Sequence, residues 1–133
     1  MQHCDWAATP VGQPENWPQP LRTTLSLMLD NGHGMFVAWG PELTFFYNDA
    51  YAPFLGSRHP AALGRPFPDV WAELWPDLAP LVDRTLAGKT IWEEERLLVM
   101  TRNGYPEDTW FSFSYSPVRD EEGRVTGMIG VVS

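Results

Sequence analysis

The fold of this 133-residue chain is decided at residues 43–51, Leu-Thr-Phe-Phe-Tyr-Asn-Asp-Ala-Tyr. The first five positions are mostly apolar or aromatic, which predicts a buried strand. Asn48 and Asp49 come next, and their side-chain oxygens are of the kind that caps helices. A short helix over residues 50–55 should follow and end at Gly56, because glycine commonly ends helices. The stretch therefore predicts a strand that leads directly into a helix.

An amphipathic helix is expected upstream, over residues 20–30. Its apolar side chains recur at helical spacing and should share one face: Leu21, Leu25, Met28 and Leu29. Prolines interrupt residues 1–19 and block a long helix there, so these residues predict an irregular arm. Trp6 and Trp17 are the expected anchors of this arm on the rest of the protein.

Residues 35–39 form another apolar run, and a short link through Gly40-Pro41 connects them to residue 43. Two strands so close in sequence should pair as an antiparallel hairpin. Prolines and glycines then limit residues 57–76 to short helical turns, and a longer helix is expected over residues 77–87. Apolar side chains at three- or four-residue spacing in both stretches should be buried: Phe67, Val70, Trp71, Leu74, Trp75, Leu78, Leu81, Val82 and Leu86.

The last third of the chain predicts three strands, over residues 91–100, 109–117 and 125–132, joined by short turns. In the middle one, Phe111, Phe113 and Tyr115 alternate with serines and should share one face of the sheet. The fold class is therefore α+β. One five-stranded antiparallel sheet is expected, with short helices covering one face. Residues 1–33 form an arm and a helix, and residues 34–133 form the domain.

Composition excludes several classes of protein. Nine basic residues against 17 acidic ones give a net charge of −8, whereas nucleic-acid binding needs a basic surface, so no nucleic-acid partner is expected. The same charge disfavours an anionic membrane surface. The sequence shows neither an apolar run long enough to span a membrane nor the pattern of a signal peptide. A cytoplasmic location is therefore expected. One cysteine excludes an internal disulfide.

Several motifs occur in an order and spacing typical of one family. They are residues 45–51, Phe-Phe-Tyr-Asn-Asp-Ala-Tyr; residues 63–67, Leu-Gly-Arg-Pro-Phe; Asn103-Gly104; residues 115–118, Tyr-Ser-Pro-Val; and the turn and strand from Asp120 to Val131. Together they make residues 34–132 resemble a PAS domain, specifically the sensor PAS domains of bacterial signalling proteins. Residues 5–12 and 17–21 also resemble the start of a group of soluble bacterial sensor histidine kinases.

The resemblance implies that the chain is the amino-terminal sensor module of a longer histidine kinase in two-component signalling. Such modules sense a ligand, a cofactor state or a partner and pass the change through the sheet to an exit helix. The residues present include no phospho-acceptor helix and no nucleotide-binding motif, so this fragment is not expected to be an enzyme. A homodimer is a further expectation, because the exposed face of the helix over residues 20–30 could pack on a second copy.

A ligand pocket is expected between the sheet and its covering helices, since ligand sites combine apolar walls with a few polar groups. Its candidate lining residues are Phe36, Tyr47, Asn48, Tyr51, Phe54, Leu63, Arg65, Phe67, Trp71, Trp75, Thr85, Phe111, Phe113, Tyr115 and Met128. The alternatives are structural: the aromatic residues could fill a packed core, Asn48 could cap a helix, and Arg65 could be a solvated turn residue. A PAS module with a filled core would act through dimerisation or protein contacts alone.

The identity of a cofactor stays open, although two kinds are disfavoured. Covalent flavin photochemistry in PAS domains needs a cysteine in the covering helices, and residues 63–71 contain none; the single thiol, Cys4, lies in the arm. Ligation of haem by histidine is not expected, because residues 77–88 contain no histidine. His59 is expected to be a surface residue, and His33 lies in a turn without partners for a metal. A small α+β enzyme is the remaining alternative, but no catalytic motif supports it.

Overall fold

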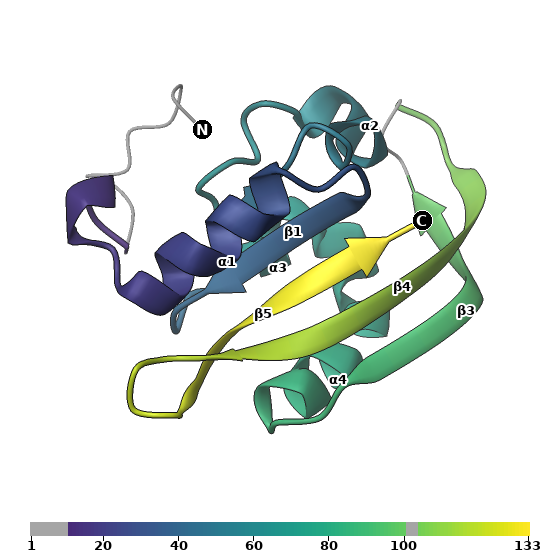
Figure 1. Ribbon diagram of the computed structural model, residues 1–133. Helices are drawn as coiled ribbons and strands as arrows, with labels where there is room; N and C mark the ends of the chain where they lie inside the picture. The colour runs from purple at the N-terminus through teal and green to yellow at the C-terminus, as the bar shows by residue number, and fades with distance from the viewer. Residues whose placement is uncertain (1–10, 101–103) are drawn as a thin grey trace.

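The computed structural model describes residues 11–100 and 104–133. Helices and strands follow one another as expected, with one longer helix before the sheet and one inside the covering layer (Figure 1). The elements are η2 (Pro14–Asn16), α1 (Gln19–Leu29), β1 (Gly34–Trp39), β2 (Thr44–Tyr47), α2 (Ala52–Leu55), η3 (Gly56–Arg58), α3 (Phe67–Val70), η4 (Ala72–Leu74), α4 (Trp75–Leu86), β3 (Ile91–Met100), β4 (Glu107–Arg119) and β5 (Val125–Val132). Within the described ranges, no helix is long and apolar enough to cross a membrane.

The five strands form one antiparallel sheet in the order β2-β1-β5-β4-β3. The predicted hairpin of β1 and β2 and the meander of β3, β4 and β5 are both confirmed. The last strand, β5, lies in the centre and joins the hairpin to the meander. The predicted α+β fold with one antiparallel sheet is thus confirmed.

The two faces of the sheet carry separate hydrophobic clusters. The inner face is covered by the short helices α2, α3, η4 and α4, and its core includes Phe36, Phe45, Phe67 and Met128. The outer face is covered in part by α1 (Figure 1), whose buried side chains pack against β1 and β2. Trp17 anchors the segment before α1 by an edge-to-face contact with Phe46, with ring centroids 5.4 Å apart. Trp6, the other expected anchor, lies outside the described residues.

Close packing between β1 and β5 places one aromatic ring over the inner face. Phe36 pairs with Gly130 across the two strands, and a Cβ atom at residue 130 would lie 2.2 Å from Cε1 of Phe36. Only a glycine therefore lets this ring lie flat against β5. The ring then extends towards the covering helices, where the candidate site lies.

Some details of the prediction are wrong. Leu29 was expected in the buried stripe of α1, but it is 47% exposed because the helix ends there and its side chain turns away from the sheet. In α4, Leu86 is only partly buried at the end of the helix, and Thr85 is fully buried instead. The helix also begins two residues earlier than expected, at Trp75, with Pro76 in its first turn, where a proline fits.

Candidate functional site

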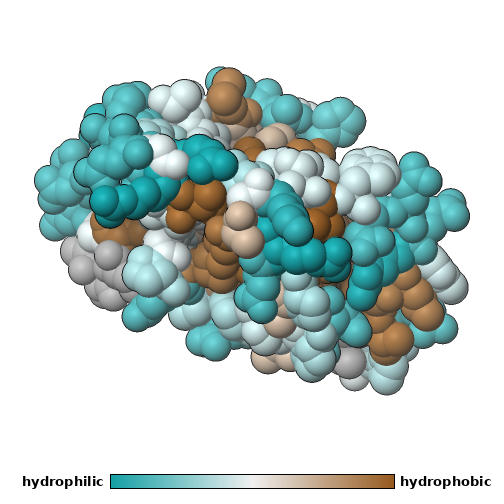
Figure 2. Space-filling view, turned by 90° about the horizontal axis from the view of Figure 1, so that it is seen from below, coloured by the Kyte–Doolittle hydropathy of each residue, from teal (hydrophilic) through white to brown (hydrophobic). Residues whose placement is uncertain are grey.

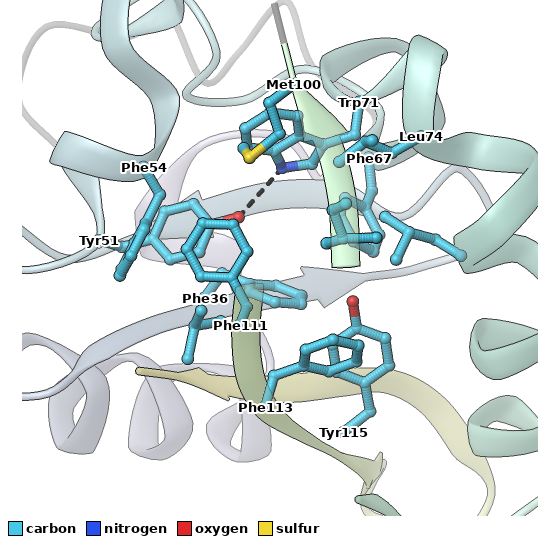
Figure 3. A pocket seen from close by; sticks show the side chains of 13 residues that line it. Phe36, Tyr51, Phe54, Phe67, Trp71, Leu74, Met100, Phe111, Phe113 and Tyr115 are labelled. Carbon is cyan, nitrogen blue, oxygen red and sulfur yellow. Dashed lines mark hydrogen bonds between the residues drawn. The ribbon is translucent and has the colours of Figure 1, made fainter. Parts of the chain in front are cut away.

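A cavity lies between the inner face of the sheet and the covering helices (Figure 3). Strands β1, β3, β4 and β5 supply its floor, and α2, α3, η4 and α4 supply its roof. Its lining consists of Phe36, Tyr51, Phe54, Phe67, Trp71, Leu74, Leu78, Leu98, Met100, Phe111, Phe113, Tyr115 and Val132. None of these side chains carries a charge at neutral pH. The cavity is therefore an apolar, mostly aromatic space with few polar atoms.

The cavity is small for a ligand site. Its volume is about 40 Å³, close to the space that one water molecule takes. Pockets for small molecules usually have volumes of roughly 300–1,000 Å³. A ligand larger than water would need side chains of the lining to move aside.

Two polar groups of the lining are bonded to each other. The indole Nε1 of Trp71, which follows α3, donates a hydrogen bond to the hydroxyl of Tyr51 at 3.0 Å (Figure 3). Arg58 lies over the Trp71 ring, 4.7 Å from its centroid, and pairs with Glu73, so the ring is held from outside the cavity. Burial raises the pKa of Tyr51, and its hydroxyl therefore keeps its proton at neutral pH.

The hydroxyl of Tyr115 is different, because it has no hydrogen-bond partner among the residues that the structure describes. This side chain is only 4% exposed, and it points from β4 into the cavity (Figure 3). Burial raises its pKa well above the ordinary value of 10, so the group is an uncharged donor. Buried polar groups are nearly always paired, with protein or with water. This hydroxyl faces a space that can hold one water molecule, so its proton is available to a water or to an acceptor atom of a ligand.

One side of the cavity is closed by two aromatic rings that are only partly buried. Phe54 of α2 and Phe111 of β4 meet edge to face, with centroids 5.2 Å apart. Gly34 makes room for Phe54, since a Cβ atom at residue 34 would lie 2.8 Å from Cε2 of its ring. The rings belong to different elements and are held by packing alone. They form the side of the cavity that can open most readily.

The structure brings together eight of the predicted site residues in the lining of this cavity: Phe36, Tyr51, Phe54, Phe67, Trp71, Phe111, Phe113 and Tyr115. The predicted alternation of β4 is therefore confirmed, because its three aromatic side chains all reach the same space.

Seven predicted residues lie elsewhere: Tyr47, Asn48, Leu63, Arg65, Trp75, Thr85 and Met128. The hydroxyl of Tyr47 bonds Nδ1 of His59 at 2.7 Å, and burial raises the pKa of Tyr47 to about 12. Thr85 donates to the carbonyl of Leu81 within α4, at 3.0 Å. Arg65 is exposed, which agrees with the alternative that it is a solvated turn residue.

Of the remaining four, three are parts of the packing around the cavity. Trp75 packs edge to face on Phe67, Leu63 is partly buried between the two clusters, and Met128 lies in the inner core. Asn48 does not reach the cavity; its amide bonds the link between α1 and β1 instead. The prediction of a helix cap is wrong, because the N-cap residue of α2 is Tyr51. Asn48 is instead a turn residue, and its Oδ1 accepts the backbone N–H of Tyr51 at 3.1 Å.

Five lining residues were missed: Leu74, Leu78, Leu98, Met100 and Val132. The helical stripe did predict Leu74 and Leu78 to be buried, but an aliphatic side chain on a buried face carries no sign of a cavity. In β3 the residues from Leu97 to Met100 are all apolar, so alternation could not show which of them face inward. For Leu74 and Leu78 the sequence thus indicated burial but not the cavity that they line, and for the other three it indicated neither.

The lining does not fit the two cofactors with the clearest residue requirements. It contains no cysteine for a flavin adduct and no histidine for haem iron. His59 is exposed and bonded to Tyr47, and His33 lies in the exposed link between α1 and β1. Cys4 lies outside the described residues. These side chains therefore offer no ligand to either group.

Comparison with known proteins gives one family and many similar folds. A family model described as the PAS fold matches residues 29–133. No curated protein sequence matches the chain. Among solved structures, an RNA-binding Light-Oxygen-Voltage receptor is 24% identical; the match covers 91% of this chain and 34% of the receptor, with a TM-score of 0.61.

Two further solved structures of similar fold include a ligand-bound protein and a domain of a sensor histidine kinase. Phage VqmA in complex with DPO is 14% identical, with 85% of this chain and 51% of VqmA covered and a TM-score of 0.60. A domain of a sensory box sensor histidine kinase/response regulator from Geobacter sulfurreducens is 16% identical. That match covers 84% of this chain and 91% of the domain, with a TM-score of 0.54. The chain thus spans about a third of the receptor and half of VqmA.

At such low identities the structures show a shared fold, and they do not transfer a ligand or an output. The family model is more specific, since it spans the whole sheet and the covering helices. The expected order of strands and helices, the cavity under the covering layer and this match agree. The chain belongs to the PAS family of sensory domains.

Proposed function

We propose that this PAS domain senses a small molecule in its aromatic cavity and regulates an attached output domain, a histidine kinase in two-component signalling. The Tyr115 hydroxyl carries this proposal, because it belongs to a buried side chain, faces the cavity and has no partner among the described residues. The kinase context is supported by the resemblance to sensor kinases and by the Geobacter sulfurreducens relative. The module itself performs no catalysis in this proposal, and it works in the cytoplasm.

The signal would pass from the cavity to the sheet as a shift between two populations. A ligand that pushes Phe111 aside acts directly on β4, and β4 pairs with β5, the last strand. An output element attached after β5 would therefore be biased by the same movement. A ligand with equal affinity for both arrangements would produce no signal.

The first experiment measures bound and added ligands. Absorption spectra and a comparison of native with denaturing mass spectra detect a compound that copurifies with the protein. A thermal-shift screen against a metabolite library then detects weaker ligands. We expect at least one compound to raise the melting temperature, because a ligand that binds only the folded state stabilises it.

A matched pair of variants shows where such a compound binds. Leu98→Phe adds volume at a lining residue, whereas Leu97→Phe adds the same volume at its exposed neighbour. The ligand-induced shift should be lost in Leu98→Phe and kept in Leu97→Phe. Equal shifts in both variants would place the ligand elsewhere, and a bare mass without any stabilising compound would contradict ligand sensing.

A ligand-free module that acts through protein contacts is the second candidate. The observation in its favour is the volume of about 40 Å³, which is far below that of ordinary ligand pockets. Four large apolar side chains on the outer face of β3 and β4 are also exposed and could contact a partner: Trp92, Leu97, Val99 and Trp110. A dry, fully packed interior distinguishes this candidate: no compound should copurify or stabilise the protein, while contacts through the exposed side chains persist.

A further inference from the structure

The chemistry of the lining restricts the class of ligand, if the cavity is the sensing site as proposed above. An ion in this space would lose its hydration without gaining a counter-charge, since no lining side chain is charged. Arg58 and Arg96 lie outside the lining and pair with Glu73 and Glu93. Nη1 of Arg58 is buried without a partner, but this side chain lies over the Trp71 ring and does not line the cavity. The ligand should therefore be uncharged.

The polar side-chain groups of the lining are one indole N–H and two hydroxyls, and each hydroxyl has one proton to donate. The indole N–H of Trp71 is used by Tyr51 Oη, which leaves the hydroxyl protons of Tyr51 and Tyr115. Neither proton has an acceptor among the described residues. A ligand that satisfies the lining must therefore bring an acceptor, such as a carbonyl oxygen or a ring nitrogen.

The shape of the lining favours a flat molecule. Aromatic rings surround the Tyr115 hydroxyl from β1, α3 and β4, and Phe113 and Tyr115 are themselves in contact, with centroids 4.9 Å apart (Figure 3). Rings prefer other rings in offset or edge-to-face contact. A cavity of roughly 150 Å³ is known to hold one benzene ring. The present volume of about 40 Å³ is smaller, so binding must displace the half-buried pair of Phe54 and Phe111.

We propose that the cavity binds an uncharged, single-ring aromatic compound whose acceptor atom takes the hydrogen bond of the Tyr115 hydroxyl. Entry is through the contact of Phe54 with Phe111, and these rings move apart as the compound enters. The same movement couples the ligand to α2 and β4. A larger bicyclic or tricyclic compound would require the inner core beyond this pair to open.

Four probes of similar size test the class of ligand. Acetophenone is neutral and carries an acceptor, ethylbenzene is neutral without one, benzoate is an anion and benzylamine is a cation. Each is titrated into the isotope-labelled protein, and the indole N–H signal of Trp71 is followed by NMR, with Trp71→Phe used for its assignment. Acetophenone should shift this signal saturably, ethylbenzene more weakly, and the two ions should leave it unchanged.

The Tyr115→Phe variant removes only the hydroxyl, and Tyr47→Phe is its control because the Tyr47 hydroxyl bonds His59 away from the cavity. Acetophenone affinity should fall roughly two- to twelvefold in Tyr115→Phe, the value of one ordinary hydrogen bond, and ethylbenzene affinity should not. Tyr47→Phe should bind both probes as the original protein does. Without ligand, Tyr115→Phe should be at least as thermostable as the original, because the lost hydroxyl had no partner.

Three results would overturn the proposal. Equal loss of both probes in Tyr115→Phe, or a destabilised unliganded variant, would show that the hydroxyl has a structural role. Tighter binding of benzoate or benzylamine would show a charged ligand class, with ligand sensing intact. The ligand class alone is wrong if none of the four probes shifts the Trp71 signal while a library compound or a copurified compound is bound. If no compound binds at all, the proposed sensing function is wrong as well.

Discussion

Asn48 joins three backbone segments through one buried side chain. Its Oδ1 accepts the N–H groups of Met35 and Tyr51, both at 3.1 Å. Its Nδ2 donates to the carbonyls of Met28, Asn31 and His33 at 2.8–3.3 Å. The residue thus ties the end of α1 and the start of β1 to the turn before α2. Asparagine suits this position, because its amide offers acceptors and donors together.

Replacement of this amide should destabilise the fold. Asn48→Ala leaves buried N–H and C=O groups without partners, and we expect a loss of about 2–4 kcal/mol in the free energy of unfolding. Chemical denaturation measures it. The control is Asp49→Ala, at the exposed neighbouring position, which should change stability by less than about 0.5 kcal/mol. Similar losses in both variants would mean that the turn as a whole, and not the amide, provides the stability.

At the scale of elements, strands with strict alternation were the most predictable. Aromatic and serine residues alternate in β4, and a period of two residues assigns one face to each set. The unbroken apolar run from Leu97 to Met100 in β3 has no such period, so its inward side chains could not be identified. In α1 the stripe predicted Leu25 to be buried correctly and Leu29 wrongly, because periodicity does not show where a helix leaves its sheet.

The candidate site was predictable to a similar extent. The sequence indicated the aromatic walls, since rings on a buried face are visible in its pattern. The hydrogen bond from Trp71 to Tyr51 joins residues 20 positions apart, and the isolation of the Tyr115 hydroxyl depends on every neighbour in three dimensions. Such properties arise from tertiary packing, and local sequence does not encode them in a readable form.

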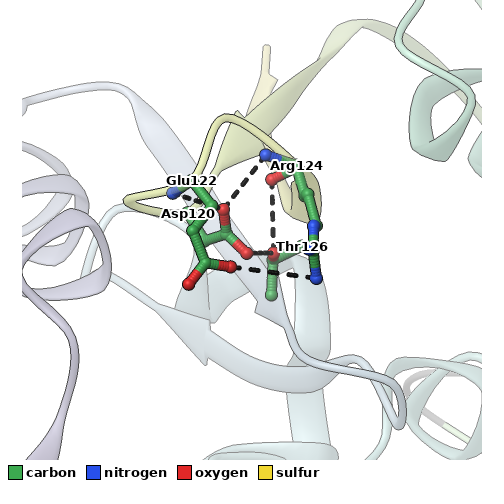
Figure 4. Close-up of polar contacts among 4 residues, drawn as sticks. All are labelled: Asp120, Glu122, Arg124 and Thr126. Carbon is green, nitrogen blue, oxygen red and sulfur yellow. Dashed lines mark hydrogen bonds and ion pairs between the residues drawn. The ribbon is translucent and has the colours of Figure 1, made fainter.

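The turn between β4 and β5 is organised by one carboxylate (Figure 4). Asp120 Oδ1 accepts the backbone N–H groups of Glu122 and Arg124 at 2.9 and 3.0 Å, and Oδ2 accepts the hydroxyl of Thr126 at 3.0 Å. These hydrogen bonds, chiefly that from the Arg124 backbone, lower the pKa of Asp120 below its ordinary value of 3.8. The ionised form is therefore the one that stabilises the turn.

This turn should make a pH-dependent contribution to stability. Because the folded-state pKa of Asp120 is lowered, the contribution is present above 3.8, the ordinary value, and is lost as the pH falls through the folded-state value. Asp120→Asn should therefore lower the denaturation midpoint at pH 7, and its difference from the original protein should shrink in acid. Glu121→Gln, at the exposed next position, is the control and should show no such convergence. A difference that stays constant with pH would mean that the carboxylate charge is irrelevant.

At the scale of the whole molecule, α1 covers only part of the outer face of the sheet. It packs on β1 and β2, and the outer face of β3 and β4 carries large apolar side chains that remain exposed, among them Trp92 at 60% and Trp110 at 61%. Cross-strand pairing places Leu97 beside Trp110, and Trp92 pairs with Ser114 further along the same two strands. Figure 2 shows hydrophobic residues reaching the surface on the side where β3 and β4 lie. Exposed apolar patches of this kind commonly mark interaction sites.

A second copy of the chain is the partner that is simplest to test. Leu97→Ser removes a side chain from the β3–β4 patch, and Leu27→Ser removes one from the exposed face of α1, the surface expected from the sequence to contact a copy. We expect the original protein to self-associate with increasing concentration in sedimentation experiments. Leu97→Ser should weaken this association several-fold and Leu27→Ser should not. Salt should strengthen the association. Two copies repel each other through their net charge of −8 and through Asp108, which lies beside Val99 on the same face, and salt screens this repulsion. Selective weakening by Leu27→Ser would assign the contact to α1, and a monomer at all concentrations would exclude both surfaces.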